Sequence, residues 1–150
     1  MLDGLKHRGA GAHAPMPEQP RRLSRLQSLQ EASDLDDAVY AHIDDFIEMM
    51  RDSNSYVRTR GLTLIACNAK WDEVGKIDGI IDEYLEHVTD EKPITARQCI
   101  KTLPKPAQMK PHLMPRIASS LRHADTSIYT DSMSHLSKMI YAMHCSLLTL

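Results

Sequence analysis

The sequence predicts an all-α fold in which pairs of helices stack one on another, and three observations lead to this prediction. Aromatic residues make up 5% of the chain and only six residues are glycine, whereas strands favour aromatic residues and barrels need many tight turns. Apolar residues recur at helical spacing from Arg21 onwards. The apolar positions also repeat every 33 to 39 residues. Because a helix pair of this size cannot bury its apolar faces alone, we expect a right-handed α-solenoid of about three helix pairs.

The first 20 residues differ from the rest of the chain. They are rich in Gly, Ala, Pro and His and show no apolar period, which is typical of a disordered tail. The folded domain is therefore expected to span residues 21–150, and its first helix begins at Arg21. Ser33 and Asp34 are expected to cap a second helix, with Asp36 and Asp37 in its first turn, where the helix dipole favours acids.

The remaining boundaries follow from breaks in the apolar pattern. Asp52 to Asn54 interrupt it, Pro93 suits the first turn of a helix, and Pro104 ends one. No segment alternates apolar and polar residues as a half-buried strand would. Further helices are expected over about residues 35–51, 55–70, 72 or 76 to 87, 93–103, from 111, and from 126 through 140.

The repeat is clearest in the second helix of each pair. Four apolar positions recur at offsets of 38 and then 36 residues, and an aspartate follows each set. The three sets are Val39, Ile43, Ile47 and Met50; Ile77, Ile81, Leu85 and Val88; and Leu113, Ile117, Leu121 and Ala124, followed by Asp52, Asp90 and Asp125.

The stretch from Asp52 to Leu64 resembles the HEAT-repeat signature, in which a turn aspartate and a Val-Arg pair precede a small residue and a leucine. Asp52, Val57-Arg58, Gly61 and Leu64 occupy these positions. The second copy keeps Asp90, Arg97 and Leu103, and the third keeps Asp125 and Leu136. The chain is also similar to small stand-alone HEAT-like proteins of bacteria, some labelled SufBD protein, a name from iron–sulfur assembly. The resemblance implies a scaffold or adaptor, since the family has few catalytic members.

The aspartates and arginines of the repeat have a physical role that does not depend on the resemblance. Asp52, Asp90 and Asp125 can accept backbone N–H groups where a helix begins. Arg58 and Arg97 lie about one repeat apart and can donate to the aspartate of a neighbouring repeat. We therefore expect these five residues to form a structural ladder along the stack.

Charge is unevenly spread along the chain, although the net charge is only −2. Residues 31–91 hold 16 acids and 5 bases, whereas residues 92–150 hold 8 bases and 2 acids. The acids on outer helices form either a solvated convex face or a docking surface for a basic partner. The candidate partner-binding residues are Asp44, Asp45, Glu48, Asp82, Glu83 and Glu86, together with Arg60, Trp71 and Lys101.

Several function classes are disfavoured. HEAT-like DNA-repair glycosylases need aromatic residues and a carboxylate in a basic groove, but Trp71 lies in the acidic repeat, so nucleic acid is an unlikely partner. Cys67, Cys99 and Cys145 are too widely spaced for a cluster-binding set, and no His pair has zinc spacing. No metal or other cofactor is therefore expected. The sequence also lacks the GxSxG, P-loop and GxGxxG motifs, so no catalytic residues are expected.

Residues 139–150 form the longest uncharged apolar stretch, which is too short to span a bilayer. Because no apolar run follows Lys6 and Arg8, a secretory signal is not expected and the predicted location is cytoplasmic. The apolar character of residues 137–150 suggests self-association through this end. The sequence as a whole predicts a non-catalytic protein-interaction scaffold. The alternative is an accessory protein that recognises DNA lesions or assists iron–sulfur assembly.

Overall fold

The computed structural model describes residues 18–127, 129 and 133–149. Within these residues all regular secondary structure is helical, and no strand is present, so the all-α prediction is confirmed there. The predicted tail lies outside the described residues up to position 17. Among the described residues the first helix is α2 (Glu18–Leu35), which begins three residues before the predicted start.

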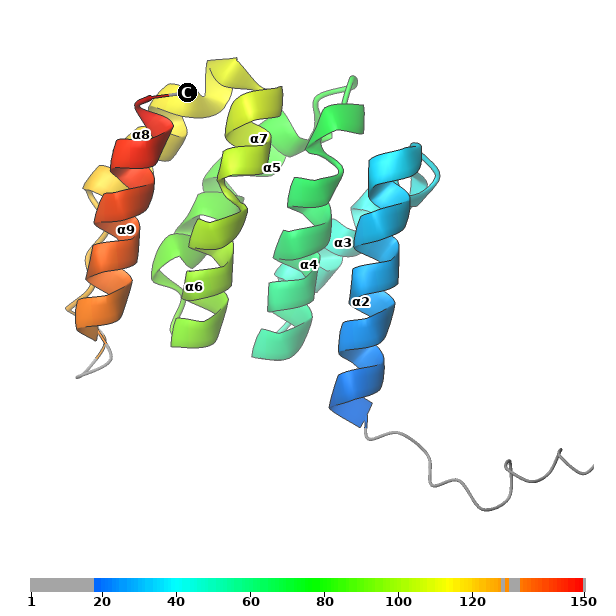
Figure 1. Ribbon diagram of the computed structural model, residues 1–150, viewed down its shortest axis with the longest axis horizontal. Helices are drawn as coiled ribbons and strands as arrows, with labels where there is room; N and C mark the ends of the chain where they lie inside the picture. Colours follow the sequence, from blue (N-terminus) through cyan, green and yellow to red (C-terminus); the bar gives the residue numbers. More distant parts are fainter. Residues whose placement is uncertain (1–17, 128, 130–132, 150) are drawn as a thin grey trace, which may run out of the picture.

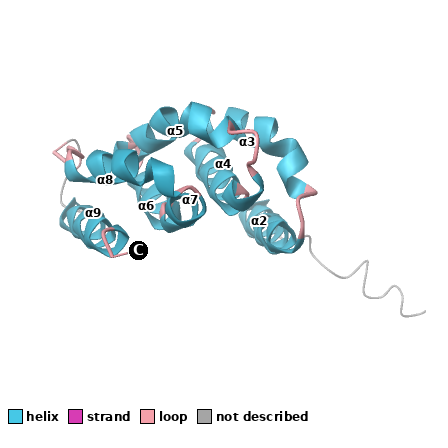
Figure 2. Ribbon diagram, turned by 90° about the horizontal axis from the view of Figure 1, so that it is seen from above, coloured by secondary structure: helices cyan, strands magenta, loops and turns pink. Residues whose placement is uncertain are grey.

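The helices form two layers that follow a common arc. One layer contains α2, α4 (Ser55–Cys67), α6 (Pro93–Thr102) and α9 (Met133–Leu147), which lie side by side (Figure 1). The other contains α3 (Ile43–Met50), α5 (Lys76–Glu86) and α8 (Met114–Arg122). Figure 2 shows the first layer on the inside of the arc and the second on the outside. We call them the inner layer and the outer layer.

Short helical segments connect the layers. The six-residue α7 (Pro104–Met109) follows α6, and in the described part of the chain four 3-10 turns join the longer helices. These turns are η1 (Val39–His42), η2 (Ala69–Trp71), η3 (His87–Thr89) and η4 (Pro111–Leu113).

The starts of α4 and α5 are fixed by side chains that accept free backbone N–H groups. The Asn54 side-chain oxygen accepts from the N–H groups of Tyr56 and Val57, at 2.9 and 3.4 Å, and so caps α4. The Asp72 carboxylate accepts from the Lys76 and Ile77 N–H groups at the start of α5. These bonds satisfy donors that have no partner inside the helix.

The predicted cap at Ser33 and Asp34 is wrong, because α2 continues through both residues to Leu35. Ser33 is buried and donates to the Leu29 carbonyl at 2.8 Å, while its own carbonyl accepts the Trp71 indole N–H at 2.8 Å. Contacts with the end of α4 and η2 therefore hold this serine inside a helix. Asp36 instead stabilises the turn that follows α2, because its carboxylate accepts the Ala38 N–H at 2.8 Å.

The C-terminal half differs from the prediction in two places. Helix α7 occupies a segment for which no helix was expected. Because proline has no N–H group, the bonding of α6 is interrupted at Pro104, and the same residue is well suited to begin a new helix. The last helix begins at Met133 rather than near residue 126. Asp125 instead accepts the Ser127 N–H in a turn, and residues 128 and 130–132 lie outside the described part.

The core lies between the two layers and contains the apolar residues that the sequence alignment singled out. The three aligned sets of apolar residues are buried, except for Ala124, which is half-buried. The two layers lie very close together at Gly61 of α4. A Cβ atom there would lie 2.6 Å from the Met50 nitrogen and 2.8 Å from the Phe46 carbonyl oxygen. Glycine therefore lets α4 pack directly on the backbone of α3.

The C-terminal segment is part of this core. Leu136, Ile140 and Leu147 of α9 are buried, while Tyr141 and Leu148 remain exposed. The apolar residues of this end are therefore largely used in packing α9 against α6 and α8. Self-association through residues 137–150 stays a prediction, and Tyr141 and Leu148 are the large apolar side chains that the described part of this segment exposes.

Candidate functional site

A buried ion pair joins α4 to the turn that precedes α6. Arg58 of α4 donates from Nε and Nη2 to the two oxygens of Asp90, at 3.0 and 2.8 Å. Its Nη1 donates to the carbonyl oxygens of Asp52 and Ser53, at 3.1 and 2.9 Å. The Arg58 and Asp90 side chains are 9% and 5% exposed. One guanidinium group thus ties together the turns that precede α4 and α6.

Asp90 is held as a carboxylate by several donors. His87 Nδ1 lies 2.7 Å from Oδ2, and the Lys92 N–H donates to Oδ1 at 2.9 Å. Burial alone would raise the pKa of Asp90, but the hydrogen bonds from His87, Arg58 and the Lys92 N–H outweigh it and hold the pKa well below its usual range. The Tyr129 hydroxyl donates to the Asp90 carbonyl oxygen. Burial and the nearby Asp90 charge raise the pKa of this tyrosine to about 12.

Of the ion pairs predicted for the ladder, the described residues form only Arg58–Asp90. Asp52 and Asp125 each accept a backbone N–H within their own turn, from Asn54 and Ser127, and Arg97 has no ion pair with a described residue. The reason is register. Arg58 follows its turn aspartate, Asp52, by six residues, whereas Arg97 follows Asp90 by seven. The Arg97 side chain therefore leaves α6 at an angle about 100° around the helix axis from the direction that Arg58 takes on α4.

A second buried pair was missed by the sequence reasoning. Lys110 donates from Nζ to Asp72 Oδ2 at 3.0 Å and to the Asp72 carbonyl at 2.9 Å, and it also reaches Asp78 at 2.6 Å. The Asp72 and Lys110 side chains are 0% and 9% exposed. Tyr40 donates its hydroxyl to Asp72 at 2.5 Å. The signal that could have found the pair is its spacing of 38 residues, which is the repeat length.

The environment of Asp72 also favours its charged form. Burial would raise the pKa of Asp72, but hydrogen bonds from Tyr40, the Ile77 N–H and Lys110 hold it below the usual value. Burial and the Asp72 carboxylate raise the pKa of Tyr40 above its ordinary value. Both the Arg58–Asp90 and the Asp72–Lys110 pairs therefore act as structural bonds between successive helix pairs.

The acids predicted as a docking surface lie on α3 and α5 in the outer layer, where bases from neighbouring pairs approach them. Lys76 contacts Asp44 at 2.8 Å, Arg51 contacts both Glu48 and Glu83 at 2.7 Å, and Arg116 lies 3.7 Å from Asp82. Much of the negative charge on this face is therefore compensated. Each such exposed pair stabilises the fold only slightly.

Two other acids of this group have different surroundings. Asp45 lies 3.6 Å from His42. Glu86 lines a cavity of about 460 Å³ between α5 and α8, together with Asp82 and Asp125. The structure thus brings three sequence-predicted residues together in one polar cavity.

The remaining predicted partner-binding residues are separated from one another. Trp71 in η2 is half-buried, and besides its bond to Ser33 its ring lies 5.4 Å from Lys70 Nζ. Trp71 therefore contributes to packing between α2 and η2. Arg60 lines a cavity of about 250 Å³ formed by residues of α2, α3 and α4, whereas Lys101 is exposed on α6.

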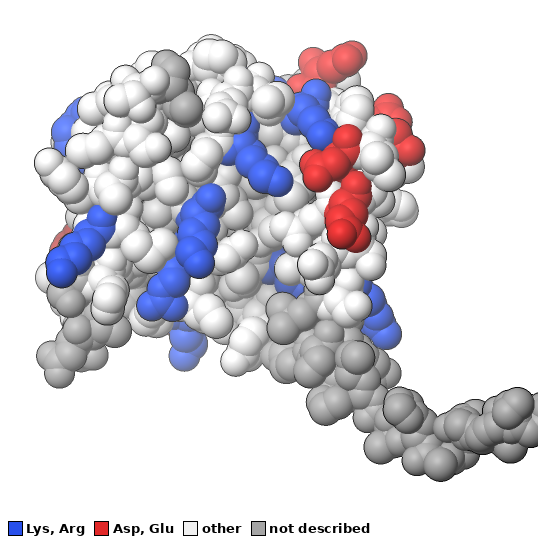
Figure 3. Space-filling view, viewed as in Figure 1, with Lys and Arg blue, Asp and Glu red and all other residues white. Residues whose placement is uncertain are grey.

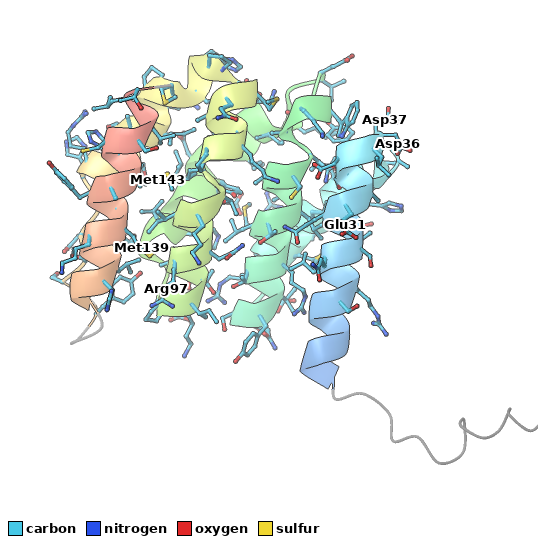
Figure 4. All side chains as sticks on the ribbon, viewed as in Figure 1. Glu31, Asp36, Asp37, Arg97, Met139 and Met143 are labelled. Atoms are coloured by element: carbon cyan, nitrogen blue, oxygen red, sulfur yellow. The ribbon has the colours of Figure 1, made fainter. Side chains whose placement is uncertain are left out.

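Basic side chains gather on the inner layer. Arg97 and Lys101 of α6 and Lys105 of α7 are spaced four residues apart, and Figure 3 shows Lys and Arg across the middle of this face, with Asp and Glu at its α2 edge. Figure 4 places Arg97 on α6, and Glu31, Asp36 and Asp37 at the α2 end. We call Arg97, Lys101 and Lys105 the inner basic stripe.

The described residues contain no group of three or more His, Cys, Asp or Glu that could hold a metal ion. Cys67 and Cys99 are buried, Cys145 is exposed, and all three are free thiols. No helix in the described part of the chain is long and apolar enough to cross a membrane. Comparisons with protein-family models, with curated proteins and with solved structures gave no match to this chain.

Acid is expected to destabilise the protein through Asp72 and Asp90. Their pKa values in the folded protein lie below the value of about 3.9 expected in the unfolded chain, so the unfolded state binds protons first as the pH falls. The stabilisation from these pairs is therefore complete above about pH 4 and is lost as the pH falls through the folded-state pKa values.

Urea unfolding at a series of pH values between 5 and 2 measures this effect. The unfolding midpoint should fall with acid, and Asp90→Asn should make the fall shallower. Asp45→Asn is the control, because Asp45 is exposed and should leave the slope unchanged. Equal slopes for Asp90→Asn and the unchanged protein would contradict the assignment.

Proposed function

We propose that this chain is a non-catalytic protein-interaction scaffold in which about three HEAT-like helix pairs stack as a right-handed α-solenoid. The observation that carries the proposal is the spacing of polar contacts between neighbouring helix pairs. These contacts join residues 32 to 40 positions apart, which is close to the repeat found in the apolar pattern. They include Arg58–Asp90, Lys76–Asp44, Thr59–Thr95, Asn68–Ser33, Lys110–Asp72 and Thr95–Ser55.

A stack of this kind supports a binding role for a physical reason. Each pair contacts its neighbours, so the molecule forms a curved slab that exposes a long inner face (Figure 2). Such a face can contact an extended stretch of a partner without a conformational change. The buried titratable groups Asp72, Asp90 and Lys110 all have partners that hold structural elements together, which leaves binding as the function best supported.

Affinity purification with the full chain as bait tests the proposal. Lysate from the source organism is passed over the unchanged chain, over a variant of the inner face carrying Lys101→Glu and Lys105→Glu, and over a variant of the outer face carrying Asp44→Lys and Asp45→Lys. We expect at least one protein to bind the unchanged chain and to be lost from one of the two variants. Capture of no protein above the level of empty beads, or equal capture by all three baits, would contradict a scaffold role.

A further inference from the structure

The inner basic stripe has no acidic neighbours in sequence. Residues 92–124 contain no Asp or Glu, so α6, α7 and α8 supply no carboxylate to Arg97, Lys101 or Lys105. None of the three has an ion pair with a described residue, and the polar contact of Lys105 is with the Cys67 sulfur at 3.5 Å. Lys101 and Lys105 are exposed and Arg97 is half-buried.

Three bases outside the stripe are arranged differently. Lys76 and Arg116 each lie against a carboxylate of the neighbouring helix pair, and Lys110 contacts two. The chain therefore compensates these bases internally, while the stripe presents its charge to solvent. Uncompensated charge in a row on one face favours association with a ligand of the opposite charge.

The stripe leads into a cavity that suits an anionic side chain. This cavity, of about 210 Å³, is lined by Cys67, Lys70, Lys105, Gln108, Met109 and Asp34. Lys70 donates from Nζ to the Asp34 carbonyl oxygen at 3.2 Å and to Asp34 Oδ1 at 3.4 Å, and its ammonium group has a third N–H for another acceptor. Two ammonium groups on the wall of one small cavity can hold a carboxylate between them. We call it the Cys67 cavity.

The surroundings of the stripe favour an acidic protein segment over a nucleic acid. Glu31, Asp36 and Asp37 lie at the α2 edge of the same layer (Figure 4) and are exposed. A phosphate backbone that ran across the layer would meet these carboxylates and be repelled. A protein segment can place acids on the stripe and neutral or basic residues at the α2 edge.

We propose that the inner face of α6 and α7 binds an acidic helical segment of a partner protein. Its carboxylates, spaced four residues apart, pair with Arg97, Lys101 and Lys105, and one of them enters the Cys67 cavity. The spacing fits Arg97 and Lys101 of α6, because four residues advance a helix by about 6 Å and a partner helix with acids at every fourth position has the same rise. Lys105 extends the row onto α7. This inference rests on the proposed scaffold function and names the chemistry of the partner.

The probe is a synthetic peptide of four Glu-Ala-Ala-Ala blocks, acetylated and amidated at its ends, with a version carrying Gln in place of Glu as the control. Iodoacetamide labelling of the full chain is followed by mass spectrometry for each cysteine. The Glu peptide should slow the labelling of Cys67 and leave the exposed Cys145 unchanged, because only Cys67 lines the proposed cavity. The Gln peptide should have no effect.

Affinity is measured by fluorescence anisotropy with the labelled Glu peptide. The Lys101→Gln, Lys105→Gln variant should bind about tenfold more weakly, while Arg116→Gln, Arg122→Gln, which changes the net charge equally on α8, should bind like the unchanged chain. Binding should also weaken with added salt. A thymidine oligonucleotide 12 nucleotides long serves as the competing polyanion.

Three results would overturn the inference. They are an absence of peptide binding, equal losses in the two double variants, and tighter binding of the oligonucleotide with shielding of Cys67. The first two leave the scaffold proposal standing if affinity purification still captures a partner that depends on the outer face. The third contradicts both proposals, since it would make the stripe a nucleic-acid site.

Discussion

Replacement of Asp90 by alanine is expected to lower the free energy of unfolding by about 3–5 kcal/mol, the usual cost of removing one partner from a buried ion pair. The change leaves the Arg58 guanidinium without a carboxylate at a position where its side chain is 9% exposed. It also removes the acceptor of His87 and of the Lys92 N–H. Urea unfolding followed by circular dichroism gives the difference.

Two further variants separate the ion pair from local effects. Asp125→Ala removes the corresponding aspartate of the next repeat, which accepts one N–H and is exposed, so its cost should be about 1 kcal/mol or less. The double variant Arg58→Met, Asp90→Ala removes both charges and should cost less than the sum of the single changes. Additive losses, or equal losses for Asp90→Ala and Asp125→Ala, would show that the buried pair does not stabilise the fold.

Replacement of Gly61 by alanine is expected to cost about 1–3 kcal/mol, although alanine is the better helix former. The added methyl group would lie within 3 Å of atoms of Phe46, Met49 and Met50, two of which belong to the backbone of α3. The backbone of a packed helix cannot give way as a side chain can, so α3 and α4 must separate.

The matched control for this prediction is Gly79→Ala in α5. A methyl group at Gly79 meets no atom within 4 Å, so the substitution should raise the free energy of unfolding by about 0.5–1 kcal/mol through helix propensity alone. Thermal and urea unfolding of the two variants should therefore shift in opposite directions. A stabilising Gly61→Ala would mean that the two layers are not in contact at this glycine.

The apolar repeat of the outer helices was predictable because each helix buries a stripe set by local periodicity. Ile43, Ile81 and Ile117 occupy equivalent positions and all are buried. The Arg58–Asp90 pair was predictable for a related reason, since the aspartate begins the turn that the repeat places beside α4. Arg97 shows the limit of this reasoning, because one additional residue after the turn rotates the side chain away from the neighbouring aspartate.

Other features depend on contacts that local sequence does not encode. Serine is a residue type preferred at helix N-caps, but the contacts of Ser33 with Trp71 and Asn68 keep it inside α2. In the sequence, Lys110 has the pattern of an ordinary solvated base next to prolines, and only its distance of 38 residues from Asp72 links the two residues. The positions of Lys70 and Lys105 around Cys67 likewise depend on how α7 and η2 pack, and α7 itself was not predicted.

The spacing of the contacts between helix pairs has a consequence for how the chain can fold. Each contact described above closes a loop of about one repeat, and the entropy lost on closing a loop grows with its length. The first and last helices therefore never have to find each other in an extended chain. For the proposed stack, we expect folding to begin at any adjacent pair and to spread in either direction. The Arg58–Asp90 and Asp72–Lys110 ion pairs would then fix the position of each newly added helix pair on the one before it.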